Sequence, residues 1–321
     1  MAKFLVTGAA GFIGCSLVRE LLKQGHEVRG FDNLSTGKRE NVADIEKDFD
    51  FRVGDLLDTA AVRKACSDME YVLHQAAVAS VPRSVENPVG SNDSNINGTL
   101  NLLIAARDSG VRRVVFASSS SVYGESATLP KDEEMMPEPI SPYAVTKLAG
   151  EMYLKCFYRV YGLETVSLRY FNVFGPRQDA NSQYSGVLAK FITRMLRGEQ
   201  PQIFGDGTQS RDFNYIDNTV QANLKAAGAP ASVVAGRAFN IATGTRITLN
   251  DTYSVLQKLT GYGESPKYGP ERAGDIKHSL ADISKAKQAF GYDPTVDFEE
   301  GMRRTVEWYR SSMVTHVAKA T

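Results

Sequence analysis

Short blocks of hydrophobic residues alternate with amphipathic stretches through the first half of the chain. The blocks are rich in Val, Leu and Phe, as expected for strands that are buried on both faces of a parallel sheet. We expect strands over residues 3–7, 27–32, 50–55, 71–76, 113–118 and 164–170. The intervals between them leave room for crossover helices. The pattern predicts an α/β fold, a Rossmann-type doubly wound parallel sheet.

Helical periodicity fills several of these intervals. Residues 12–24 carry an apolar face and are followed by Gly25, a typical helix stop. A second helix is expected over residues 94–108. A third begins with Ser141 as its cap and ends near Gly162.

The regular alternation becomes weaker after residue 172. We therefore expect a first domain over residues 1–172 and a smaller C-terminal α/β domain, mainly over residues 173–321. A late strand over residues 236–242 is expected to rejoin the main sheet. The chain of 321 residues is 42% hydrophobic and 23% charged, as is usual for a soluble globular protein.

The charge balance argues against some classes of partner. Lys plus Arg and Asp plus Glu both number 37, so nothing indicates nucleic acid or an acidic membrane. No apolar stretch approaches the roughly 20 residues of a membrane span, and the N-terminus has no leader pattern. The three cysteines are scattered, with no metal-ligand spacing, and are expected to be buried thiols. We expect a cytoplasmic protein without a metal site.

A glycine-rich turn, Thr7-Gly8-Ala-Ala-Gly11-Phe-Ile-Gly14, joins the first expected strand to the first helix. In such a turn the glycines allow a tight bend, close approach of the backbone to a pyrophosphate, and close packing of helix on strand. The amino end of the helix then offers free N–H groups to the phosphates. The turn therefore predicts a dinucleotide site.

Acidic residues end the next two strands. Asp32 is placed to accept hydrogen bonds from an adenosine ribose and would repel a 2′-phosphate, which favours NAD over NADP. Lys38 and Arg39 follow closely, so NADP stays open. Asp55 and Leu56 are placed near the adenine, although Asp55 could also be a turn residue.

Tyr143 and Lys147 are four residues apart on the third helix and so face the same direction. A neighbouring ammonium group favours the phenolate form of tyrosine, which makes it a usable base. Hydroxyl groups from the run Ser118–Ser121 lie at the carboxyl edge of the fifth strand, where ligands bind in such sheets. Alone, a Tyr-x-x-x-Lys spacing usually marks a solvated helix face, and a serine run can be a packing loop. Together with a dinucleotide turn they predict hydride transfer at a carbon that bears a hydroxyl.

These residues together resemble the extended short-chain dehydrogenase/reductase family and, within it, the UDP-sugar 4-epimerases. The likeness extends from the first strand to about Trp308. Besides the glycine turn, it is carried by His74-Gln-Ala-Ala77, Ser119 to Gly124, Tyr170-Phe-Asn172, Gly205-Asp-Gly207, Arg211-Asp-Phe213 and Arg272-Ala-Gly-Asp275.

The resemblance implies a role for each matching position. The catalytic residues would be Ser119, Tyr143 and Lys147. NAD would be contacted by Gly8, Gly11, Phe12, Ile13, Gly14, Asp32, Asn33, Ser35, Asp55, Leu56, Gln75, Ala76, Ala77, Ser94, Tyr143, Lys147 and Phe171. The UDP-sugar would be contacted by Ala79, Ser80, Ser119, Ser120, Ser121, Tyr143, Asn172, Val187, Leu188, Gln202, Phe204, Arg211, Arg272, Asp275 and Ser279. Of these, Asn172, Arg211 and Arg272 would hold the diphosphate.

The expected reaction is inversion at C4 of a UDP-hexose through a 4-keto intermediate. Dehydratases of the family carry an Asp-Glu pair where this chain has Ser120 and Ser121, and the glutamate usual in UDP-glucuronate decarboxylases is also absent. Small residues such as Ser279 leave room for an N-acetyl group, so UDP-GlcNAc/UDP-GalNAc is expected, with UDP-glucose/UDP-galactose as well. A UDP-glucuronate 4-epimerase or decarboxylase and a non-catalytic NAD-binding scaffold are the alternatives.

The resemblance also implies a homodimer. Its interface would be a four-helix bundle formed by the helices over residues 94–108 and 143–162 of each subunit. Leu154, Phe157 and Tyr158 would supply its apolar surface, unless they pack within the subunit.

Overall fold

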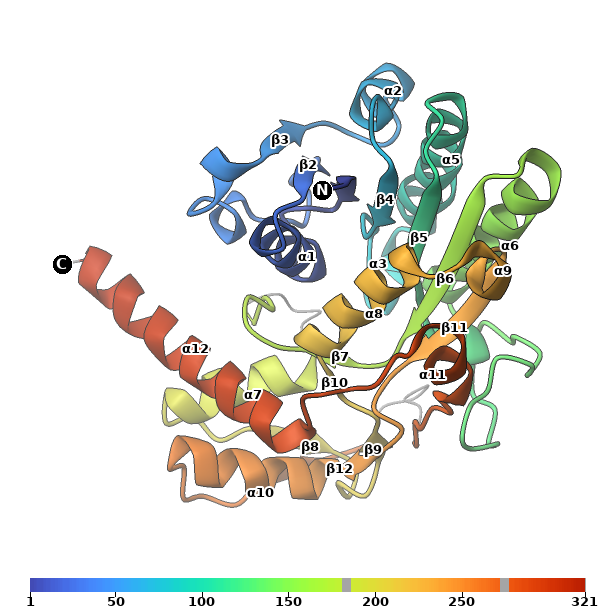
Figure 1. Cartoon of the computed structure of the whole chain (residues 1–321). Helices are drawn as coiled ribbons and strands as arrows, with labels where there is room; N and C mark the ends of the chain where they lie inside the picture. Colours follow the sequence, from blue (N-terminus) through green and yellow to red (C-terminus); the bar gives the residue numbers. More distant parts are fainter. Residues whose placement is uncertain (181–185, 272–276, 321) are drawn as a thin grey trace.

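A seven-stranded parallel sheet forms the centre of the computed structural model, which describes residues 1–180, 186–271 and 277–320, with side chains as far as residue 313 (Figure 1). The strand order is β11-β6-β5-β4-β1-β2-β3. Strands β2 and β3 are added on one side of β1, and β4, β5 and β6 are added on its other side. The sheet is therefore doubly wound, as predicted. The strands are β1 (Lys3–Thr7), β2 (Glu27–Asp32), β3 (Asp50–Val53), β4 (Tyr71–His74), β5 (Arg113–Ser119), β6 (Glu164–Tyr170) and β11 (Arg237–Ile241).

Both faces of this sheet are buried. In β1, Phe4 and Val6 point into one hydrophobic cluster and Leu5 into another, because successive side chains leave a strand on opposite sides. Helix α1 (Phe12–Lys23) and α8 (Ile216–Gly228) cover the first face. The second face is covered by α2 (Thr59–Cys66), α5 (Gly98–Asp108) and α6 (Pro142–Tyr161). The expected strands and the first and third helices are confirmed to within a few residues.

The second expected helix differs from the prediction. It starts earlier, as α4 (Pro88–Asn92), and passes through a π-helical turn, η3 (Asp93–Asn97), before it continues as α5. The short helix α3 (Val81–Glu86) precedes it. Asn95 lies in this π-helical turn and faces the interior, with 2% of its surface exposed.

Some expectations about individual side chains are wrong. Leu154 and Phe157 do not form a surface, because they are 1% and 4% exposed in the core beneath α6. Tyr158 is 37% exposed. Cys15 and Cys66 are buried, but Cys156 is exposed.

The C-terminal half adds a second group of helices and short strands, which Figure 1 shows gathered at a distance from β2 and β3. This group contains α7 (Val187–Leu196), α10 (Leu249–Thr260) and α12 (Phe298–Ala320). Three strand pairs connect its loops, namely β7 (Val173–Phe174) with β10 (Asn214–Tyr215), β8 (Gln202–Phe204) with β13 (Lys267–Gly269), and β9 (Ser210–Arg211) with β12 (Ile247–Thr248). Two further helices, α9 (Ala231–Val234) and α11 (Ser284–Phe290), instead contact β6 and β11 of the main sheet. Strand β11 pairs in parallel with β6 at the edge of the main sheet.

None of the helices in the described ranges is both long enough and apolar enough to span a membrane.

Candidate active site

The glycine turn brings three backbone segments into close contact at the carboxyl end of β1. Gly8 adopts φ +67, and a Cβ there would lie 2.8 Å from the backbone nitrogen of Ala76. A Cβ on Gly14 would lie 2.0 Å from the carbonyl oxygen of Gly8. No side chain caps α1 at Gly11. The first turn of α1 therefore lies directly against the strand end, and its N–H groups are not engaged by a side-chain cap.

Asp32 ends β2 beside this turn and is 7% exposed. Its carboxylate accepts hydrogen bonds from the backbone N–H groups of Ala10, at 2.9 Å, and Leu34, at 2.8 Å. Burial raises its pKa, and these two N–H groups act in the opposite direction. Asp32 thus fixes the glycine turn as well as facing the expected ribose position.

Lys38 and Arg39, the two basic residues that could have favoured NADP, each form an ion pair. Lys38 lies 3.2 Å from Asp179, and Arg39 is paired with Glu46. Both positive charges near Asp32 are therefore partly neutralised, which disfavours a 2′-phosphate at this position.

The residues expected near the adenine lie at the ends of β2 and β3. Asn33 donates to Asp55 at 2.8 Å and accepts from the N–H of Ser35 at 3.0 Å. Leu56 is 8% exposed and packs against Gly98, where a Cβ would be 2.9 Å away.

Helix α6 places Tyr143 and Lys147 beside the end of β5. The Ser141 side chain caps the helix by accepting from the N–H of Ala144 at 3.2 Å, as predicted. The Lys147 ammonium donates to the Ala117 carbonyl at 2.7 Å and lies 5.8 Å from the centre of the Tyr143 ring. Ser119, two residues further along β5, is hydrogen-bonded to Tyr143.

Burial has the largest effect on the pKa values of Tyr143 and Lys147, which together with Ser119 we call the trio. It lowers the pKa of Lys147 to about 7, so the amine can gain or lose a proton near neutral pH. Burial raises the pKa of Tyr143, while the hydrogen bond with Ser119 lowers it. The protein groups alone therefore do not lower the pKa of Tyr143 toward neutral pH in the way that the sequence had led us to expect.

The hydroxyls of the serine run have separate environments. Ser118 points away from the trio and donates to Glu151 at 2.5 Å. Ser119 also accepts from the N–H of Ser121 at 3.2 Å, which caps the single turn η4 (Ser120–Tyr123). The Ser121 hydroxyl is buried and has no hydrogen-bond partner among the residues that the structure describes.

A buried polar chain that we did not predict connects the glycine turn to α6. His74 bonds with Thr7 through Nδ1 at 2.7 Å and with Thr99 through Nε2 at 2.9 Å. Thr99 donates to the Asn95 carbonyl, and the Asn95 amide donates to Thr146 at 3.0 Å. Burial, aided by the charge of Lys147, lowers the pKa of His74 to about 3, so its ring stays neutral. The i, i+4 spacing of Asn95 and Thr99 was the available sequence signal.

The backbone of Tyr143 is held at both ends. Its N–H donates to the Ser84 hydroxyl at 3.0 Å, and its carbonyl accepts from Thr146 at 2.8 Å. Ser84 is fully buried on α3. Helix α3 is itself capped by Ser80, whose hydroxyl accepts from the N–H of Arg83.

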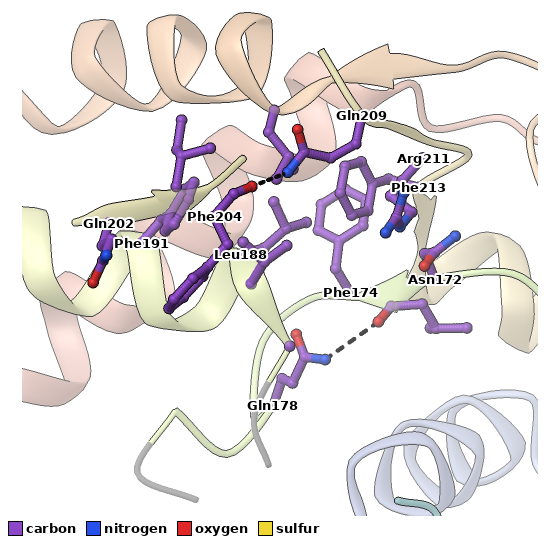
Figure 2. Close-up of a pocket in the computed structure, with 15 residues that line it drawn as sticks. Asn172, Phe174, Gln178, Leu188, Phe191, Gln202, Phe204, Gln209, Arg211 and Phe213 are labelled. Carbon is purple, nitrogen blue, oxygen red and sulfur yellow. Dashed lines mark hydrogen bonds between the residues drawn. The ribbon is translucent and has the colours of Figure 1, made fainter. Parts of the chain in front are cut away.

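A cavity of about 290 Å³ lies between β7, α7, β8 and β9 (Figure 2). In Figure 2, Asn172 and Arg211 lie at one end and Gln202 at the other. The cavity brings together the expected substrate residues Asn172, Val187, Leu188, Gln202, Phe204 and Arg211. Its walls also include residues that we did not predict, chiefly Phe174, Gln178, Phe191, Gln209 and Phe213.

Polar groups at the first end of this cavity are rigidly placed. Asn172 follows β6 with φ +30, a conformation that Asn tolerates better than most residues. It donates to the Asp212 carbonyl at 3.1 Å. Arg211 donates to the carbonyls of Ser210 and Lys277. Arg272 and Asp275, expected on the nucleotide, lie outside the described residues.

The other expected contact residues differ in how far they are buried. Gln75, Ala76 and Ala77 follow β4 and are half-buried, as are Ser94, Ser120 and Ser279, whereas Ala79 is exposed. Phe171 is completely buried in a cluster with Tyr123. It therefore packs beneath the site and has no exposed surface to offer a cofactor.

The sequence model of the NAD dependent epimerase/dehydratase family matches residues 4–242. The chain belongs to this family. The match covers the glycine turn, the trio and the cavity residues up to Phe213.

Solved structures and curated relatives of this epimerase/dehydratase family resemble the chain over its whole length. One is a UDP-glucose 4-epimerase from Thermotoga maritima with UDP-glucose, 42% identical, covering 97% of this chain and 99% of that one, with a TM-score of 0.92. Another is a UDP-N-acetylglucosamine 4-epimerase from Methanobrevibacter ruminantium in complex with UDP-N-acetylmuramic acid, 43% identical, with the same coverage and TM-score. A UDP-glucuronate 4-epimerase from Thermodesulfobacterium geofontis is 35% identical over 325 residues, 98% of each chain.

NAD, the cofactor of the family, fits the cradle around the glycine turn. The backbone of Gly8 lies so close to that of Ala76 that only glycine fits there, and the amino end of α1 has no side-chain cap. Phosphate groups suit such a helix terminus, since its N–H groups and partial positive charge both favour an anion. Asp32 at the end of β2 suits an unphosphorylated ribose.

Proposed function

We propose that the protein inverts the configuration at C4 of UDP-hexoses, with NAD as a tightly held cofactor. The arrangement of Ser119, Tyr143 and Lys147 beside the glycine turn supports this proposal most directly. The cavity with Asn172 and Arg211 would hold the UDP portion, because an amide and a guanidinium at one end suit a diphosphate.

Tyr143 would act as the base that removes the proton from the sugar O4. Ser119 would orient that hydroxyl or relay its proton, since its own hydroxyl is bonded to Tyr143. Lys147, anchored on the Ala117 carbonyl, would place positive charge near the phenolate and hold the cofactor ribose. NAD, when bound, would supply the hydride acceptor and, in its reduced form, the hydride donor for C4. Between removal of the O4 proton by Tyr143 and its return to O4, the 4-keto sugar would rotate and present its other face.

The nucleotide cavity and the trio are separate parts of the site. None of the three trio residues lines the described wall of that cavity. The UDP portion can therefore be gripped by Arg211 and the aromatic walls while the sugar extends toward Tyr143. This division suits a reaction in which only the sugar must rotate.

We propose UDP-GlcNAc/UDP-GalNAc and UDP-glucose/UDP-galactose as the substrate pairs. Support comes from the small side chains of Ser120 and Ser121, in the turn that follows Ser119, and from Ser279, whose N–H donates to the Ser210 carbonyl beside Arg211. UDP-glucuronate is the second candidate, because a relative 35% identical is a UDP-glucuronate 4-epimerase.

A product assay would test these substrate proposals. The purified protein is incubated with UDP-GlcNAc, UDP-glucose and UDP-glucuronate in separate reactions without added NAD, and the epimers are separated by chromatography. We expect the C4 epimers of the first two. If only UDP-glucuronate is converted, the proposed sugar preference is wrong. If none is converted by NAD-containing protein, the proposed activity is wrong.

We also propose a homodimer through a four-helix bundle, in which α6 and the helical segment that runs from α4 to α5 meet their counterparts. Supporting side chains differ from those expected, because Val89, Val145 and Met152 are the exposed apolar residues there, at 69%, 48% and 50%. Helices α4 and α6 contact each other within the subunit, and Val145 and Met152 are seven residues apart on α6. Sedimentation analysis should show a dimer that M152E dissociates and V53E, on distant β3, does not. A wild-type monomer at micromolar concentration would exclude the proposal.

A further inference from the structure

A row of buried polar side chains crosses the sheet directly behind the catalytic trio. Ser118 on β5 is in register with Arg169 on β6, which is in register with Asn240 on β11. All three are buried, at 2%, 4% and 0% exposure. A charged arginine in this position requires partners, because an unpaired buried charge is costly.

Two further residues join the row into one network. Glu151 of α6 accepts from Ser118 at 2.5 Å and from Arg169 at 2.9 Å on Oε1, and from Arg169 at 2.8 Å on Oε2. The Tyr123 hydroxyl accepts from Arg169 at 2.9 Å and donates to Asn240 at 2.7 Å. Every charged group in the row thus has a partner.

Glu151 shares a helix stripe with the two expected reactive residues. Tyr143, Lys147 and Glu151 follow one another at intervals of four on α6 and face β5 together. Lys147 bonds to the Ala117 carbonyl, Glu151 to the Ser118 hydroxyl and Tyr143 to the Ser119 hydroxyl. Consecutive residues of β5 are therefore each tied to one residue of the stripe.

The opposite end of the row reaches segments near the substrate side. The Asn240 amide donates to the carbonyls of Lys131 and Asp282, and its backbone N–H donates to Glu133. The neighbour of Asp282, Ala281, donates its N–H to Asp212, next to Arg211. The row thus connects the catalytic helix with the arm that carries Arg211.

We propose that Glu151 and Arg169 are positioning residues that set the register of α6 against β5 and so hold Tyr143 and Lys147 in reactive geometry. The bidentate contact between the guanidinium and the carboxylate fixes both distance and orientation. A shift of the stripe by a fraction of a residue would separate Tyr143 from Ser119. The inference rests on the proposed function for its kinetic readout but not for its spectroscopic one.

The same two strands supply a matched control. At their opposite ends, Arg113 on β5 is in register with Glu164 on β6, and the pair bonds at 2.9 Å. Arg113 is fully buried, like Arg169, and also donates to carbonyls at the end of α8. This ion pair has the same chemistry but no contact with the α6 stripe among the described residues.

The experiment compares E151Q, R169M and the milder S118A with E164Q, all as NAD-loaded protein. It measures kcat and KM, the melting temperature, and the ionisation of Tyr143 from tyrosinate difference absorbance against the same variants carrying Y143F. We expect E151Q and R169M to lose at least about tenfold in kcat with KM within about twofold, since small displacements of reacting groups have such effects. Tyr143 should ionise at higher pH in both. S118A should change both readouts in the same direction by a smaller factor.

E164Q should lower the melting temperature but leave kcat and the Tyr143 titration unchanged. Equal kcat losses in E151Q and E164Q, or an unchanged Tyr143 titration in E151Q, would overturn the proposal. If E151Q and R169M do not fold, unchanged kcat and titration in folded S118A would overturn it. If the wild type converts no UDP-sugar, the proposed function is wrong, and the Tyr143 titration still decides this inference.

Discussion

Replacing Gly14 with alanine tests how the cofactor cradle is built. The added methyl group would lie 2.0 Å from the Gly8 carbonyl oxygen, 2.7 Å from its carbon and 3.0 Å from the Ala9 Cα. These are backbone atoms and cannot rotate away. Helix α1 must therefore retreat by about 1.4 Å before contact with that oxygen becomes ordinary.

Such a retreat affects both stability and cofactor binding. Leu17, Val18 and Leu21 on the inner face of α1 are fully buried and would lose packing. Overpacking of this kind typically costs about 1–3 kcal/mol of unfolding free energy. The helix N–H groups would also move away from the phosphates, so we expect at least about a tenfold weaker hold on NAD, or about 1.4 kcal/mol.

Urea unfolding and the NAD content of purified protein would measure these two effects. The control is G228A at the end of α8, where no atom lies within 4 Å of the added methyl and φ is not positive. It should leave NAD content unchanged and raise stability by at most about 1 kcal/mol. If G14A carried as much NAD as the wild type and unfolded at the same urea concentration, the close approach of α1 to Gly8 would not be what shapes the site.

Further substitutions test other parts of the site. Y143F should reduce kcat by about 10²–10⁴-fold, the usual contribution of a positioned base, with unchanged NAD content; activity within tenfold of wild type would exclude Tyr143 as the base. R211M should raise KM for the UDP-sugar by at least about tenfold through loss of a charge-assisted contact, and a change in kcat alone would contradict its placement at the nucleotide. Because burial lowers the pKa of His74 to about 3 in the folded protein, its contribution to stability is complete above its unfolded pKa of about 6.5 and is lost as the pH falls toward 3. Urea unfolding at pH 7 and pH 5 should therefore show a loss of about 2 kcal/mol that is absent in H74Q, and equal losses in both proteins would show that His74 is not the group responsible.

The sequence was sufficient for the main sheet because its strands are continuous apolar blocks. Strands β1, β2 and β6 coincide with the expected ranges, and the cap at Ser141 fixed the start of α6. Helix α4 was missed because it is only five residues long and depends on the Asn87 cap and the following π-helical turn.

Side-chain partners were harder to predict than elements. The face of α6 that carries Leu154 and Phe157 is apolar whether it meets another subunit or the core, and periodicity does not distinguish the two. The contact between Asn95 and Thr146 joins residues 51 positions apart. Likewise, Phe174 and Gln178 become cavity walls only when β7 pairs with β10. Local sequence patterns contain no information about such distant partners.

The pairing of cations around Asp32 has a consequence for anyone who wishes to redesign the coenzyme preference. Replacing that aspartate with a neutral residue would remove repulsion without supplying attraction, because Lys38 is engaged by Asp179 and Arg39 by Glu46. A successful conversion would also have to release one of these basic groups from its carboxylate. Since Asp179 adjoins Gln178, which lines the cavity of Figure 2, neutralising Glu46 is the less disruptive route.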